Sequence, residues 1–178
     1  MSFVAISMSD KRFDKISDMV RKSYVNACVL YIDEVVNAPL QEAYERRRES
    51  IKSMRGAVEE RQLFHGTSDE FIDPIAINGF DPTKNKTAMY GYGTYFAVNA
   101  SYSYNYMRSA TNNEVTYMFL ADVLIGLQTQ GKRQQPGTAA VYDWDNNVDV
   151  LSKPTIYTSP YADGAYPRYI IAFHKNAK

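Results

Sequence analysis

The hydrophobic pattern of the first third of the chain alternates between helical and strand-like periods. Residues 10–24 carry apolar side chains at helical spacing and predict an amphipathic helix capped by Ser9. The β-branched run 28–36 predicts a strand. A second helix is expected from Asn37, a good N-cap, to Gly56, a good helix stop. Its expected buried stripe consists of Leu40, Tyr44, Ile51 and Met54.

After this helix the pattern turns mainly to strands. The expected strands are 60–65, 94–97, 114–125, 155–158 and 166–173, and short helices are expected at 69–77 and 100–107. Loops are expected at 80–92 and 128–137, and a polar turn at 143–147. Helices followed by strands that must largely pair antiparallel predict the α+β class. We expect one domain over residues 1–178.

Composition narrows the functional classes. The 178 residues include 45% apolar and 22% charged residues, which is ordinary for a globular domain. Lysine and arginine together number 20, as do aspartate and glutamate, so the chain lacks the basic excess typical of duplex-DNA binding. The sequence contains no apolar run of membrane-spanning length and no charged-then-apolar leader. We therefore expect an intracellular protein, cytoplasmic or nuclear, without a membrane partner.

Metal and thiol chemistry have little support in the sequence. The single cysteine, Cys28, cannot form an internal disulfide or a thiolate zinc site, and its apolar neighbours predict a buried position. The two histidines, His65 and His174, are too few for a histidine-based metal site, so no metal is expected.

The tyrosines suggest a ligand pocket. The chain has 15 tyrosines, and residues 90–106 hold six of them together with Ser101 and Ser103. On a helix, Ser103 and Tyr106 would share a face, presenting a hydroxyl and a ring to a planar amide-bearing heteroaromatic ligand. Residue types alone equally allow tyrosines that pack a small core. The arginines at 46–48 are interpreted as a solvated helix face rather than a phosphate site.

Five segments, taken together and in order, resemble the catalytic domain of the poly(ADP-ribose)-polymerase-like, or diphtheria-toxin-type, ADP-ribosyltransferases. The resemblance covers about residues 28–173, nearly the whole chain. The resemblance implies the ADP-ribosyltransferase fold, with mixed, mostly antiparallel split β-sheets flanked by helices, and NAD as the donor substrate. The segments are Leu-Phe-His-Gly-Thr at 63–67, Gly-Tyr-Gly-Thr-Tyr-Phe-Ala at 91–97, Ala-Ser-Tyr-Ser-Tyr-Asn-Tyr at 100–106, Tyr-Met-Phe-Leu-Ala-Asp-Val-Leu-Ile-Gly at 117–126, and Lys-Pro-Thr-Ile-Tyr at 153–157 followed by Ala-Tyr-Pro-Arg-Tyr-Ile-Ile at 165–171.

The resemblance also implies roles for individual residues. Two ribose contacts, two carboxamide contacts and two stacking rings would surround the donor, beside a donor loop at 80–92. His65 would contact the nicotinamide-side ribose, and Thr67 the adenine-side ribose. Gly66 and Ser103 would hold the carboxamide. Tyr95 and Tyr106 would lie on either side of the nicotinamide ring.

The third position of the catalytic triad, after His65 and Tyr95, departs from the chain-elongating members. Those members have a glutamate there, whereas this sequence has Ile156, which can neither accept a hydrogen bond nor take a proton. The resemblance then implies transfer of one ADP-ribose to protein side chains, including its own. The strand at 158–160 is also unusually polar. Two alternatives stay open: an inactive module that binds NAD or ADP-ribose, and a transferase acting on nucleic-acid ends.

Overall fold

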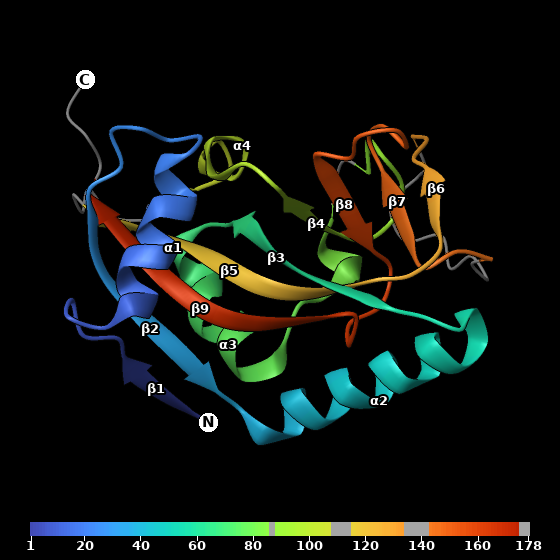
Figure 1. Ribbon diagram of the computed structural model, residues 1–178, viewed down its shortest axis with the longest axis horizontal. Helices are drawn as coiled ribbons and strands as arrows, with labels where there is room; N and C mark the ends of the chain where they lie inside the picture. The colour runs from blue at the N-terminus through green and yellow to red at the C-terminus, as the bar shows by residue number, and fades with distance from the viewer. Residues whose placement is uncertain (86–87, 108–114, 134–142, 175–178) are drawn as a thin grey trace.

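The computed structural model describes residues 1–85, 88–107, 115–133 and 143–174 (Figure 1). Its elements are β1 Ser2–Ala5, α1 Lys11–Arg21, β2 Val29–Val36, α2 Ala38–Arg55, β3 Glu59–Gly66, the 3-10 helix η1 Asp69–Phe71, α3 Ile72–Asn78, the 3-10 helix η2 Pro82–Lys84, β4 Thr94–Ala97, α4 Ala100–Tyr104, β5 Val115–Ile125, β6 Gln128–Gln130, β7 Asn146–Val148, β8 Ile156–Ser159 and β9 Ala165–His174.

The strands form one sheet that is almost divided in two. Within the described residues its order is β1-β2-β9-β5-β3-β4-β8-β7-β6, and every pair is antiparallel except β6 with β7. The β-ladder between β3 and β4 consists of the single pair Phe64 and Ala97. The predicted α+β class and mostly antiparallel pairing are confirmed, and the expected split appears as this single-pair junction.

The two faces of the sheet bury different helices (Figure 1). Strand β5 alternates its side chains, so Met118 and Leu120 join the apolar cluster containing the buried face of α1. Phe119 and Ala121 point to the other face and join the cluster that includes Ile72 of α3. Because both faces are covered, β5 is buried along most of its length, as its long apolar run predicts.

The ends of α1 and β2 correct two expectations. The N-cap of α1 is Asp10 rather than Ser9, because the Asp10 carboxylate accepts a hydrogen bond from the backbone N–H of Arg12 at 2.8 Å. Cys28 precedes β2 and is exposed, so the prediction of a buried cysteine is wrong. Its apolar neighbours Ala27 and Val29 take the two inward positions on either side of it.

Helix α2 follows the expected limits. Asn37 caps its start, and Gly56 ends it in the left-handed conformation at φ 81°. Met54, predicted to be buried, is 60% exposed. Within the arginine triplet, Arg47 contacts Asp163 at 2.8 Å and Arg48 contacts Glu45 at 3.2 Å, so these two side chains form structural ion pairs.

Three short strands escape prediction. β1 is exposed at every residue, while β6 and β7 lie where a loop and a polar turn were expected. β6 and β7 contain polar residues and are held by backbone pairing with each other, and β7 also pairs with β8. A period-2 hydrophobic pattern cannot reveal such strands. None of the helices described is both long and apolar enough to cross a bilayer.

Candidate active site

The candidate site lies where β3 and β4 separate. Phe64 is the last residue of β3 that pairs with β4. The next two residues, His65 and Gly66, pair only with β5, on the other side of β3. Helix α4 packs beside this end of β3. The end of β3 thus lies between the two halves of the sheet, with His65 and Gly66 partly buried.

His65 is held in one orientation by a backbone hydrogen bond and by aromatic rings. Its Nδ1 lies 2.8 Å from the carbonyl oxygen of Tyr95. The ring centroids of Phe80 and Phe96 lie 5.1 and 5.6 Å from the imidazole. Because a carbonyl can only accept, Nδ1 carries the proton and the neutral ring keeps Nε2 as an acceptor.

Burial lowers the pKa of His65 below the ordinary histidine value, and the hydrogen bond to Tyr95 opposes this shift to a smaller extent. The neutral ring is therefore the form present near neutral pH. Its Nε2 can accept a hydrogen bond from a hydroxyl but cannot act as a cationic donor.

Gly66 and Ser103 are in direct contact. A Cβ at Gly66 would lie 1.8 Å from the carbonyl oxygen of Ser103, so only glycine permits this approach. The buried Ser103 hydroxyl donates to the carbonyl of Phe64 at 3.1 Å. Backbone groups alternate between the two edges of a strand, so Gly66 points its N–H and C=O to the same edge as Phe64. An amide ligand at this edge would find a donor and an acceptor.

Tyr95 ties β4 to the preceding loop. Its hydroxyl accepts from the N–H of Tyr90 at 2.7 Å and donates to the carbonyl of Gly91 at 2.9 Å. Burial raises the pKa of this phenol, and nearby Tyr106 also raises it. Since both hydroxyl contacts belong to the loop, the ring rather than the hydroxyl is the part available to a ligand.

Tyr106 follows α4, which is shorter than the predicted helix 100–107. The helix ends at Tyr104, yet the N–H of Tyr106 donates to the carbonyl of Ser103 at 3.0 Å and keeps the two residues one tight turn apart. The ring of Tyr106 lies 5.4 Å from that of Tyr102, and the two hydroxyls are 3.1 Å apart. Tyr106 is 52% exposed, so its ring borders the site from outside.

Ile156 begins β8 and is buried. In the pairing of β8 with β4, Ile156 is opposite Ala97 and Thr158 is opposite Tyr95. Ile156 and Thr158 are two residues apart on one strand, so Ile156 and Tyr95 lie on the same face of the sheet. Asp149 fixes the start of this strand by accepting from the N–H groups of Thr155 and Ile156 at 2.9 and 3.0 Å. Burial raises the pKa of Asp149, but hydrogen bonds from Thr155 and Ile156 outweigh it and lower the pKa overall.

The predicted residues thus fall into a connected arrangement. His65 contacts Tyr95, Gly66 contacts Ser103, and Ser103 contacts Tyr106. Thr67 follows directly after β3 and is half-buried. The sequence analysis missed Phe80, Phe96 and Asp149, because their roles come from packing and capping between segments distant in sequence.

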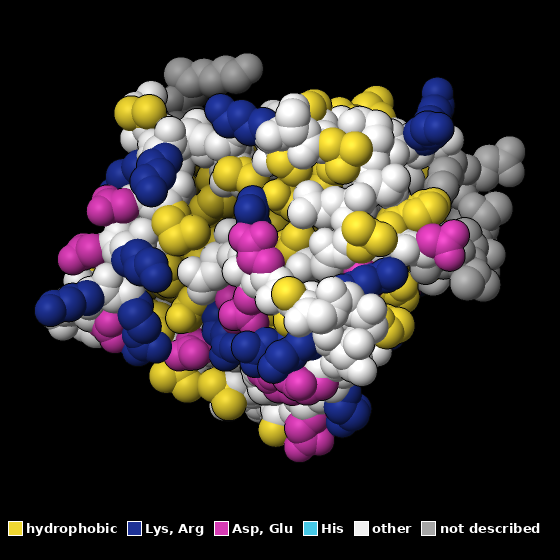
Figure 2. Space-filling view, turned by 45° about the vertical axis from the view of Figure 1, so that its right-hand side comes forward, with side chains coloured by type: hydrophobic (Ala, Val, Ile, Leu, Met, Phe, Trp, Pro, Cys, Tyr) yellow, Lys and Arg dark blue, Asp and Glu magenta, His cyan; other side chains and the backbone are white. Residues whose placement is uncertain are grey.

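Clustered metal ligands are not a feature of the described part of the chain. Among those residues, no group of three or more histidine, cysteine, aspartate or glutamate side chains could hold a metal ion. Figure 2 shows basic and acidic side chains intermixed on one face of the molecule rather than separated into patches. On this face the surface matches the balanced charge of the sequence.

Comparison with known proteins tests the family resemblance drawn from the sequence motifs. A family profile described as "Poly(ADP-ribose) polymerase catalytic domain" matches residues 9–150. Human protein mono-ADP-ribosyltransferase PARP12 is 32% identical over 184 aligned residues, which cover 98% of this chain and 26% of that protein. Human PARP11 is 31% identical, with 91% of this chain and 56% of that protein covered. Human PARP14 is 30% identical, with 97% and 10% covered.

The chain spans 56% or less of these three relatives, while the alignments cover almost all of the chain itself. The family profile ends at residue 150, before Ile156, whereas the alignment with PARP12 covers 98% of the chain. The family resemblance drawn from the sequence motifs is confirmed. The chain belongs to the family of poly(ADP-ribose) polymerase catalytic domains.

Proposed function

We propose that this chain transfers a single ADP-ribose unit from NAD to a protein side chain and releases nicotinamide. The observation that carries the proposal is the contact between Gly66 and Ser103 at the open end of β3, next to His65. This contact holds Ser103 against the backbone of Gly66, and any larger residue at position 66 would push α4 away. Relatives at about 30% identity bear the name mono-ADP-ribosyltransferase, which agrees with the proposal.

In this proposal each residue has a distinct task. The backbone of Gly66 and the hydroxyl of Ser103 hold the carboxamide, and Tyr95 and Tyr106 stack on the nicotinamide ring. Nε2 of His65 accepts a hydrogen bond from a hydroxyl of the nicotinamide-side ribose. Thr67 lies where its hydroxyl serves the adenine-side ribose. The site thereby fixes both parts joined by the glycosidic bond that must break.

The reaction breaks the bond between the ribose carbon and the pyridinium nitrogen. The bonding electrons go to the nitrogen and leave neutral nicotinamide, while the ribose carbon becomes an oxocarbenium-like centre. An oxygen of the acceptor attacks this carbon and forms the new glycosidic bond. Any proton on that oxygen passes to solvent or to a base of the acceptor. Preorganised polar groups around the leaving group favour this charge redistribution.

Ile156 supports a single transfer rather than chain growth. Its buried hydrocarbon side chain lies on the same face as Tyr95 and supplies neither a hydrogen-bond acceptor nor a base. A ribose hydroxyl would receive no activation at this position. An acceptor carboxylate needs none, because it is already an anion at neutral pH. We therefore propose protein acceptors with carboxylate side chains, the chain itself among them.

Labelled NAD provides the direct test. We expect nicotinamide release together with a single labelled protein band, because one unit is added at each site. Ser103→Ala should reduce release by about tenfold or more through loss of a buried polar contact. The exposed Ser101 lies on the same helix, so Ser101→Ala is the matched control and should retain the wild-type rate.

Each contrary outcome has a separate meaning. A ladder of long products would contradict single transfer. Tight NAD binding without nicotinamide release would contradict enzymatic activity and favour a binding module. Label on a phosphorylated oligonucleotide in place of protein would contradict the acceptor class.

The pKa of His65 makes the pH profile informative. Because burial lowers this pKa below the ordinary value of 6.5, the neutral ring and its Nε2 acceptor persist as the pH falls through 6.5. Nicotinamide release should therefore stay constant across that range and decline only at more acidic pH. A decline centred at or above the ordinary histidine value would contradict the proposed role of neutral His65. Single-turnover rates, measured with folding checked by circular dichroism, separate this effect from acid unfolding.

The proposed setting is inside the cell, in the cytoplasm or nucleus. The exposed free thiol of Cys28 suits a reducing compartment, where such cysteines stay unpaired.

A further inference from the structure

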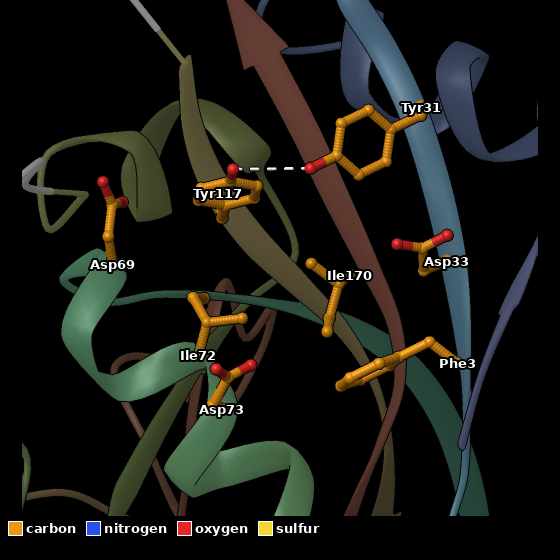
Figure 3. A pocket seen from close by; sticks show the side chains of 8 residues that line it. All are labelled: Phe3, Tyr31, Asp33, Asp69, Ile72, Asp73, Tyr117 and Ile170. Atoms are coloured by element: carbon orange, nitrogen blue, oxygen red, sulfur yellow. Dashed lines mark hydrogen bonds between the residues drawn. The ribbon is translucent and has the colours of Figure 1, made fainter. Parts of the chain in front are cut away.

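A cavity lies between the first helical turns after β3 and the face of the sheet formed by β1, β2, β9 and β5 (Figure 3). It has a volume of about 250 Å³. Tyr31, Ala172 and Tyr117 form one row across β2, β9 and β5, and the small alanine between the two tyrosines leaves space above it. The lining residues are Phe3, Tyr31, Asp33, Asp69, Ile72, Asp73, Tyr117 and Ile170.

The cavity is separated from the donor site by strand β5. Asp33, Ile170, Phe119 and His65 pair in one row across four neighbouring strands. Three strand spacings separate Asp33 from His65, which corresponds to about 14 Å. The Asp33 side of the cavity therefore lies beyond Phe119 from the imidazole, whereas Asp69 on the helical side follows Gly66 by three residues in the chain.

Three carboxylates line the cavity without a cationic partner. Among the described residues, Asp33, Asp69 and Asp73 form no ion pair, although other acidic residues of the chain do. One oxygen of Asp69 is buried and has no hydrogen-bond partner. Asp33, Asp69 and Asp73 therefore give the cavity a negative charge that no ion pair offsets among the described residues.

Aromatic surface accompanies the charge. The hydroxyl of Tyr31 donates to that of Tyr117 at 3.4 Å, and the two rings form a T-shaped contact with centroids 6.5 Å apart. Burial raises the pKa of Tyr31, as do its hydrogen bond with Tyr117 and the charge of Asp33. The Tyr31 phenol thus remains neutral beside the carboxylates. Neutral rings next to negative charges are well suited to an organic cation.

A metal ion does not explain these features. The acidic residues of the described chain include no group of three close enough to hold one ion. The carboxylates in Figure 3 are instead spread around the cavity, with Asp33 on the sheet side and Asp69 and Asp73 on the helical side. Separated acceptors around an aromatic wall match an extended cation with several donors.

We propose that this cavity binds an arginine side chain of a protein partner. A guanidinium group carries five donors in a planar fork, so it can reach carboxylates on both walls while its plane stacks on a tyrosine. An ammonium group is a compact point charge and would satisfy one wall at a time. The apolar side chains of Phe3, Ile72 and Ile170 would cover the arginine methylenes.

Backbone amide NMR of the whole chain tests the proposal with blocked Gly-X-Gly peptides in which X is arginine, lysine or citrulline. Citrulline keeps the shape of arginine but lacks the charge. The arginine peptide should shift the amides of the cavity-lining residues, and the other two should bind several-fold more weakly. Asp33→Asn should weaken arginine binding about threefold to fivefold, the range expected for one partly exposed ion pair.

Glu70→Gln is the matched control, because Glu70 is an exposed acid beside Asp69 that does not line the cavity. This variant should bind the arginine peptide as the wild type does. Nicotinamide release by Asp33→Asn should also be unchanged, so failure of the donor-site proposal would be distinguishable from failure of this one. Equal binding of citrulline or lysine, shifts outside the cavity, or full affinity in Asp33→Asn would each overturn the arginine assignment.

Discussion

Replacement of Gly66 by alanine is expected to lower nicotinamide release by about 100-fold or more. The added methyl group would lie 1.8 Å from the carbonyl oxygen and 2.7 Å from the carbonyl carbon of Ser103. These are backbone atoms of α4, so the helix itself must move by more than a small rotamer adjustment. Misplacement by about 1 Å is enough for a 100-fold loss when groups must hold a substrate in reacting geometry. Rates are measured by chromatography of released nicotinamide.

Gly56→Ala is the control for a general glycine effect. Gly56 ends α2 at φ 81° and has no atom within 4 Å of its added Cβ. Alanine there should cost about 1 kcal/mol of unfolding free energy through backbone strain and leave release unchanged. A folded Gly66→Ala protein with normal release would contradict the proposed carboxamide site.

Phe119→Ala is expected to reduce the free energy of unfolding by about 3–5 kcal/mol. Phe119 is fully buried at the centre of β5, and its ring centroid lies 5.7 Å from that of Phe80. The loss combines buried apolar area with the cavity left behind. Urea denaturation followed by circular dichroism measures the change.

The same substitution links the core to the site, since Phe119 pairs with His65 and Phe80 packs against the imidazole. Phe71→Ala removes an equal ring that is 47% exposed, and should cost less than about 1 kcal/mol. If Phe119→Ala lowers the free energy of unfolding by less than about 1 kcal/mol, the central role of this ring in the core is contradicted.

The sequence is most predictive where local chemistry and burial agree. Helix α2 has a capping asparagine and a terminal glycine, and β5 has a long apolar run, so both were located from the pattern. Strands β6 and β7 contain mainly polar residues and exist through pairing with distant segments. The exposure of Cys28 likewise depends on how the chain enters β2, which local hydrophobicity does not specify.

For the site, the motifs identified residues but not how they are supported. The connection of Gly66 to Ser103 follows from the packing of α4 on β3, and a sequence carries no direct record of that contact. Asp149 shows the limit most clearly, because its carboxylate caps Thr155 and Ile156 from another segment. The polar run after Ile156 looked unusual in the sequence, and in the structure Thr158 and Ser159 are fully enclosed members of β8.

The ladder of β3 with β4 is a single residue pair, so the site residues belong to two parts of the sheet that meet at this pair. His65 and Gly66 belong to the large part, with β5 and β9 behind them, while Tyr95 and Ile156 belong to the small part with β8. The two parts nevertheless share one apolar cluster, in which Phe119 of β5 lies with Phe96 of β4 and Tyr157 of β8. We therefore expect a substitution in the shared core to alter the positions of site residues in both parts.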